Sequence, residues 1–253
     1  MSALTSIRRF APQPGADQAV LCFPHAGGCA SFFRSWSSLL PSAQVCAVQY
    51  PGREDRIAEP TAASLLELAE SVAEEILAEP TRLSVLFGHS MGAYVAFEVA
   101  HCLQRAGAAV PTLVVSSAAA PALRPPVPFE SSAEVLAYLE RYEPVSAEIR
   151  EDPELLDLIL DYIKGDLRLV AEYREHTGKR IDARLVAVVG ADDVPEIRSR
   201  FTPWRGHTEA EFVPMVTPGG HFYLRTDPPA PLILAELARC LATVGTSSGW
   251  EAI

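Results

Sequence analysis

A serine between two glycines is the first feature of this sequence that could do chemistry, in the stretch SVLFGHSMGAY. Gly88, Ser90 and Gly92 match the G-x-S-x-G pattern of a nucleophile elbow, a tight strand-to-helix turn that exposes the serine hydroxyl. Glycines suit both flanks because side chains there would clash with the strand and the helix. The alternative is a glycine-rich helix start that Ser90 caps. The apolar run at 83–87 and the helical pattern at 93–105 favour the elbow and predict Ser90 as a nucleophile.

A serine is a weak nucleophile without a base and an orienting acid, and candidates for both follow predicted strands. Asp192 and Asp193 come after one short apolar run, and His221 comes after the next one along the chain. The order serine, aspartate, histidine is the one expected with a nucleophile elbow. Because the carboxyl ends of parallel strands meet at one sheet edge, we expect a triad of Ser90, His221 and one of the two aspartates.

The loop FPHAGG contains another histidine, His25, and small residues whose backbone could closely approach a negatively charged oxygen. We expect the backbone N–H groups of Ala26 and Met91 to form an oxyanion hole, the alternative being an ordinary glycine turn. The other histidines lie beside Ser90 or in helical and loop stretches, so we expect none of them to be the base: His89, His101, His176 and His207.

The elements that must position these residues alternate between strand-like and helix-like patterns. Short apolar runs are typical of strands buried on both faces, and helices between them indicate a parallel sheet. The sequence therefore predicts a single doubly wound α/β domain over residues 1–253. Its predicted strands cover 19–23, 45–49, 83–87, 112–117, 184–189 and 211–216, and its predicted helices cover 62–78, 93–105 and 229–243.

One segment, about 125–178, interrupts this alternation with helical periodicity alone. Four prolines between Pro121 and Pro128 predict that it begins as a stiff, extended linker. Its position in the chain favours a helical lid over a substrate pocket. The alternative is a set of extra helices packed on the sheet.

The composition of the 253 residues excludes several classes of protein. A formal net charge of −11 would repel a nucleic-acid backbone. No apolar run approaches the roughly 18 residues of a membrane span, and none behind the N-terminal arginines resembles a signal peptide. The five cysteines are scattered without a CxxC pair, which indicates reduced thiols in the cytoplasm and no metal site.

Five motifs, in order along the chain, resemble those of type II thioesterases, the stand-alone editing enzymes of polyketide synthase and nonribosomal peptide synthetase pathways. They are FPHAGG, QYPGREDR, FGHSMGA, GADD and PGGHFYL, and the likeness covers about residues 19–240. The sequence departs from the family at Gly206, where an acid is expected, outside the triad. The resemblance implies an α/β-hydrolase fold that hydrolyses acyl groups from the phosphopantetheine arm of carrier domains.

The resemblance also implies which aspartate is the acid. The G-x-x-D pattern that begins at Gly190 ends on Asp193 and so favours it over Asp192. Thioesterases fused to a synthase often carry the acid before the lid, but the corresponding loop here, SAAAPALRPPVPF, has none. No cofactor is implied, the expected partner is an acyl or peptidyl carrier domain, and the expected oligomeric state is a monomer.

Three residues are candidate contacts to the substrate or the carrier: His25, Arg53 and Arg56. For the two arginines the alternative is a solvated loop in which Glu54 and Asp55 neutralise both charges. Two other functions stay open at this point. A carboxylesterase or another small-molecule hydrolase would use the same triad, and a binding protein on a hydrolase scaffold would need none of it.

Overall fold

The computed structural model describes residues 5–244, except for 14, 79–81, 129, 175–177 and 226–230. At its centre is a seven-stranded sheet with the strand order β1-β3-β2-β4-β5-β6-β7. β1 pairs antiparallel with β3, and the other neighbouring strands pair parallel. The strands are β1 (Ile7–Arg9), β2 (Ala19–Phe23), β3 (Gln44–Val48), β4 (Leu83–His89), β5 (Thr112–Ser116), β6 (Leu185–Gly190) and β7 (Phe212–Thr217).

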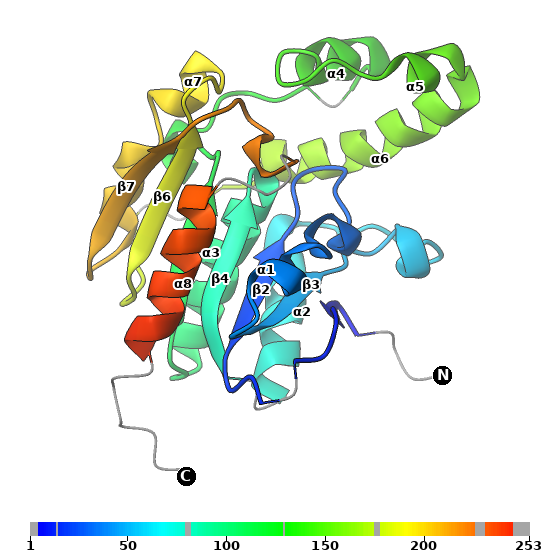
Figure 1. Ribbon diagram of the computed structural model, residues 1–253. Helices are drawn as coiled ribbons and strands as arrows, with labels where there is room; N and C mark the ends of the chain where they lie inside the picture. The colour runs from blue at the N-terminus through cyan, green and yellow to red at the C-terminus, as the bar shows by residue number, and fades with distance from the viewer. Residues whose placement is uncertain are drawn as a thin grey trace.

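Four helices flank this sheet: α1 (Trp36–Leu39), α2 (Leu65–Ala78), α3 (Met91–Arg105) and α8 (Pro231–Val244). α2 and α3 pack on one face of the sheet, and α1 and α8 pack on the other (Figure 1). A smaller helix, α7 (Pro195–Arg198), follows β6. The doubly wound α/β architecture predicted from the sequence is thus confirmed.

β2 illustrates why the buried strands are continuous apolar runs in the sequence. Leu21 and Phe23 pack with α2 and α3, whereas Val20 and Cys22 pack on the side of α1 and α8. All four side chains are fully buried, so neither face of the strand needs a polar residue.

The six predicted strands and three predicted helices are present, with ends shifted by a few residues. The predicted start of the last helix, at 229–230, lies outside the described residues. β1 was missed because its three residues, IRR, contain no apolar run, and the strand forms only by pairing with β3 at the edge of the sheet.

Three helices, α4 (Ser132–Leu139), α5 (Ala147–Glu151) and α6 (Pro153–Glu172), lie between β5 and β6 in the chain. We call them the helical insertion. In Figure 1 they lie across the carboxyl ends of the strands, with α6 as the longest. They have a small apolar core of their own, made of Val135, Leu160, Ile163 and Leu167. The structure thus has helices where the sequence predicts them, and their role as a lid stays a prediction.

A buried ion pair holds the chain just after α6 against α3. Glu98 of α3 is 2% exposed and accepts hydrogen bonds from the Tyr173 hydroxyl, at 2.6 Å, and the Lys179 ammonium, at 2.7 Å. Tyr173 directly follows α6. The helical insertion therefore ends on an electrostatic anchor as well as on apolar packing.

We predict that Lys179→Met lowers the free energy of unfolding by about 3–5 kcal/mol, because it leaves the Glu98 carboxylate buried without its charged partner. The control is Arg180→Met. It breaks the exposed pair between Arg180 and Glu209 and should change stability by about 0–1 kcal/mol. Urea unfolding of both variants measures the difference, and equal losses would show that the Glu98 pair is not an anchor.

Candidate active site

The turn from β4 into α3 holds Ser90 in a strained backbone conformation. Its φ is 54° and its ψ is −117°, which few non-glycine residues adopt. A Cβ on Gly88 would lie 2.2 Å from the carbonyl oxygen of Gly92, and one on Gly92 would lie 2.0 Å from that of Phe23. Neither position can hold a side chain. Ser90 makes no side-chain capping bond to α3, so the helix-cap alternative is wrong and the turn has the features of a nucleophile elbow.

The loops after β6 and β7 bring one aspartate and one histidine together. Nδ1 of His221 lies 3.0 Å from Oδ1 and 3.1 Å from Oδ2 of Asp193. The Asp193 side chain is 0% exposed and that of His221 is 6% exposed, whereas Asp192 is exposed to solvent. The structure thus pairs His221 with Asp193 rather than with Asp192, as the G-x-x-D pattern indicated.

A glycine contact keeps these two loops at a fixed separation. A Cβ on Gly190, at the end of β6, would lie 2.4 Å from the carbonyl oxygens of both Gly219 and Gly220. The N–H of Asp192 also donates to the carbonyl of Gly219 at 2.9 Å. The glycines of GADD and PGGH therefore allow the acid loop and the histidine loop to touch, a role that the sequence analysis did not assign to them.

Below His221 lies a buried chain of polar groups that the sequence analysis also missed. The Ser116 hydroxyl contacts Nδ1 of His89, at 2.8 Å, and the hydroxyl of Tyr223. The next residue, Ser117, donates to the carbonyl of His221 at 3.4 Å. Burial, followed by the charge of His221, holds the pKa of His89 well below its ordinary value. His89 is therefore neutral at physiological pH.

The loop after β2, residues 24–28, runs beside the Ser90 turn, and we call it the oxyanion loop. Ala26 in this loop and Met91 at the start of α3 line the same pocket as Ser90 and His221. Neither the Ala26 N–H nor the Met91 N–H donates a hydrogen bond to any residue that the structure describes. Two unused donors beside a serine hydroxyl are what an oxyanion hole requires.

His25, the candidate substrate contact in the same loop, is 7% exposed. Its ring packs edge-on against those of Phe32 and Phe222, with 5.0 Å between centroids in each case. Burial, and then the charge of Arg225, lower the pKa of His25 to about 3. The side chain is therefore neutral at physiological pH, and any contact that it makes with substrate is that of an uncharged ring.

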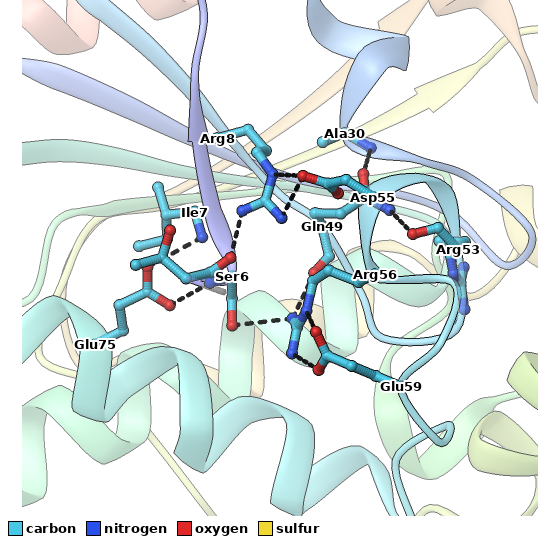
Figure 2. Close-up of polar contacts among 11 residues, drawn as sticks. Ser6, Ile7, Arg8, Ala30, Gln49, Arg53, Asp55, Arg56, Glu59 and Glu75 are labelled. Atoms are coloured by element: carbon cyan, nitrogen blue, oxygen red, sulfur yellow. Dashed lines mark hydrogen bonds and ion pairs between the residues drawn. The ribbon is translucent and has the colours of Figure 1, made fainter. Parts of the chain in front are cut away.

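The two arginines of PGREDR are both engaged inside the molecule. Arg53 is 2% exposed and forms a two-point ion pair with Asp166 of α6, at 2.8 and 2.7 Å. Arg56 pairs with Glu59 and donates to the carbonyl of Gln49 at 2.7 Å, as Figure 2 shows.

The solvated-loop alternative for these arginines is therefore wrong, because neither pairs with Glu54 or Asp55. Asp55 instead pairs with Arg8 (Figure 2). In this conformation the Arg53 guanidinium is also out of reach of a docking carrier, and carrier binding by the two arginines stays a prediction.

The helical insertion forms much of the wall of the pocket that contains Ser90. Tyr138, Leu167 and Val170 of these helices line it, together with Val127 from the chain before α4. Tyr142, just after α4, packs on His221 with ring centroids 4.5 Å apart. The pocket is small, about 40 Å³. Ser90, His221, Ala26 and Met91 thus line one small pocket, whose wall is both polar and apolar.

Within the described ranges, no three His, Cys, Asp or Glu side chains cluster in a way that could hold a metal ion. No described helix is both long and apolar enough to cross a membrane. Of the histidines set aside in the sequence, His101 lies in α3, and Nδ1 of His207 donates to the backbone carbonyl of Lys179 at 3.2 Å. His176 lies outside the described residues.

Comparisons with known proteins agree with this geometry. The family model for the thioesterase domain matches residues 18–238. Thioesterase PikA5 of Streptomyces venezuelae is 40% identical over 224 residues, which are 86% of this chain and 79% of that protein. A probable cadicidin biosynthesis thioesterase of Streptomyces griseus is 35% identical over 221 residues, and the match spans 86% of this chain but only 61% of that relative.

A solved structure extends the likeness to the fold. The type II thioesterase BorB, from the borrelidin biosynthetic cluster, has a TM-score of 0.80 and 34% identity to this chain, covering 93% of it and 97% of BorB. The resemblance to type II thioesterases noted in the sequence is thereby confirmed. The chain belongs to the thioesterase domain family and has the α/β-hydrolase fold.

Proposed function

We propose that this chain hydrolyses acyl thioesters held on the phosphopantetheine arm of acyl or peptidyl carrier domains, and so removes acyl groups from a polyketide or nonribosomal peptide assembly line. The observation that supports the chemistry best is the pairing of His221 with the buried Asp193 at the pocket of Ser90. The carrier-bound substrate is supported by the relatives, since BorB is a type II thioesterase of a biosynthetic cluster.

The first half of the proposed reaction forms an acyl-serine. Ser90 Oγ attacks the thioester carbonyl carbon while Nε2 of His221 takes the hydroxyl proton, and Asp193 stabilises the resulting imidazolium through Nδ1. The N–H groups of Ala26 and Met91 stabilise the negative charge on the carbonyl oxygen. The intermediate then expels the thiol of the arm, which leaves with the proton from His221.

The second half releases the acyl group as a free acid. His221 takes a proton from water, which attacks the acyl-serine carbonyl, and the same two N–H groups stabilise the second oxyanion. Collapse of this intermediate returns the proton to Ser90 Oγ. The two halves balance with water as the only co-reactant.

A second, larger pocket supports a substrate with a long arm. It has a volume of about 390 Å³ and shares Ala26 with the Ser90 pocket. His25 and Gly27 line it from the oxyanion loop, and apolar side chains of the helical insertion, such as Leu160 and Ile163, line it from above. Two pockets that meet at the oxyanion loop fit an acyl group bound in one and its arm in the other.

We predict that the protein hydrolyses an acyl-carrier thioester with a kcat/KM at least about tenfold above that for the p-nitrophenyl ester of the same acyl group, because the arm contributes binding energy remote from the reacting carbon. A carboxylesterase would reverse this preference. Ser90→Ala should abolish both activities and labelling by a fluorophosphonate, whereas Ser71→Ala, on the exposed surface of α2, should not. Labelling of the Ser90→Ala protein would contradict the assignment.

We predict that Asp193→Asn lowers kcat by about 10⁴, because the histidine would no longer be held in the useful tautomer. Asp192→Asn serves as the control: this side chain is exposed, and the carboxylate that pairs with His221 is that of Asp193, so its loss should be mild. Steady-state turnover of the same thioester measures both. A severe loss in Asp192→Asn with a mild one in Asp193→Asn would move the acid by one residue.

The role of the helical insertion as a lid predicts weak protection from hydrogen exchange at 132–172 in the free protein. Its separate core is small, and Leu155 and Leu158 on α6 are 40% and 57% exposed. Protection should rise there, but not in β4 or β6, when Ser90→Ala is mixed with an acylated carrier. Strong protection before the carrier is added would indicate a fixed cap.

A further inference from the structure

Asp166 is a buried acid that the proposed chemistry does not use. It lies on α6 in the helical insertion and is 3% exposed. One of its carboxylate oxygens, Oδ2, accepts hydrogen bonds from the backbone N–H of Gly27, at 2.7 Å, and from Nη1 of Arg53, at 2.8 Å. The other, Oδ1, accepts from Nη2 of Arg53 at 2.7 Å. The acid therefore binds the oxyanion loop directly, from a different part of the chain.

Arg53 holds the same loop at a second point. Its Nη1 also donates to the carbonyl of Gly28 at 3.1 Å. The guanidinium lies near the rings of Tyr50 and Tyr162, at 5.3 and 5.6 Å from their centroids. The backbone carbonyl of Arg53 accepts from Gln49, whose side-chain oxygen accepts from the N–H of Ala30 (Figure 2). The arginine is thus held at both terminal guanidinium nitrogens and at its backbone carbonyl, and it forms a fixed point for the loop.

These contacts determine the direction of the Ala26 N–H through the backbone of the oxyanion loop. Asp166 and Arg53 hold Gly27 and Gly28, and the N–H of Gly28 donates to the carbonyl of His25 at 2.8 Å. The His25 carbonyl and the Ala26 N–H belong to one trans peptide, so they point in opposite directions. Fixing the carbonyl therefore fixes the N–H, which is the predicted oxyanion donor.

Steric contact at Gly27 also restrains the conformation of the oxyanion loop. Gly27 has φ +76°, and a Cβ there would lie 2.6 Å from Cγ1 of Ile163, one turn before Asp166 on α6. The loop and the helix are in direct contact, and glycine both allows the backbone conformation and leaves room for the helix.

We infer that Asp166, together with Arg53, is a positioning residue: it holds the oxyanion loop so that the Ala26 N–H points at the developing oxyanion. Because Asp166 belongs to the helical insertion, the oxyanion hole is complete only while α6 is seated on the loop. This inference rests on the proposed hydrolysis through Ser90, but not on a carrier-bound substrate.

The test uses Asp166→Asn, which keeps the shape of the side chain but faces Arg53 with an amide instead of a full carboxylate. Expected is a fall in kcat of about 10²–10³, as for the loss of one oxyanion donor, with KM nearly unchanged. A trifluoromethyl ketone that forms an oxyanion adduct on Ser90 should bind more weakly by a similar factor. The probes are butyryl-N-acetylcysteamine and p-nitrophenyl butyrate.

Two further variants separate positioning from stability. Arg53→Lys keeps a cation beside Asp166 and loses the two-point geometry, so kcat should fall by about tenfold in a folded protein. Arg53→Lys also tests the inference if the Asp166→Asn protein does not fold. Arg184→Met breaks another partly buried pair, between Arg184 and Glu236 of α8, and should lower the melting temperature without changing kcat or inhibitor binding.

The inference is overturned if a folded Asp166→Asn or Arg53→Lys protein retains wild-type kcat and inhibitor affinity. It is also overturned if Arg184→Met loses activity and stability in the same ratio as those two variants. Failure of the proposed function looks different. A wild-type protein that cleaves the free ester but no carrier-bound thioester would refute the carrier substrate and leave this test valid. A wild-type protein that neither cleaves the probes nor reacts with a fluorophosphonate would overturn both.

Discussion

The end of β2 and the start of α3 approach so closely that Gly92 has no room for a Cβ, and the site is built around this contact. The carbonyl oxygen of Phe23 occupies the space in which that atom would lie. The chain that continues from β2 must therefore run directly past the turn of Ser90. This is why Ala26 and Met91, from segments far apart in the sequence, line one pocket.

Around that contact, polar groups are buried with partners rather than excluded. His89, Ser116 and Tyr223 form a chain of neutral groups under the histidine loop, and Asp193 is buried against His221. Each of these hydrogen bonds restrains the groups that it joins, because breaking it would leave a buried donor or acceptor unpaired. The protein thus keeps its reactive groups in place with the same interactions that would destabilise it if they were broken.

The parts of this arrangement that follow from local pattern and from parallel topology could be predicted, and the ion pair of Arg53 with Asp166 could not. Ser90, Asp193 and His221 each follow a short apolar strand, so their meeting at one sheet edge is a consequence of parallel topology. The partner of Arg53 lies 113 residues away on α6, and no spacing indicates it. The solvated-loop alternative paired the arginines with the adjacent acids Glu54 and Asp55, because sequence proximity is the only guide before the fold is known.

The placement of Asp166 on α6 also bears on how the protein would choose among acyl groups. A group too large for the small pocket of Ser90 would push the helix away, and the carboxylate would leave Gly27 with it. Discrimination by size would then act on the rate of the chemical step and not on affinity. Bulky acyl groups would then bind and dissociate without being hydrolysed, whereas short ones would be hydrolysed.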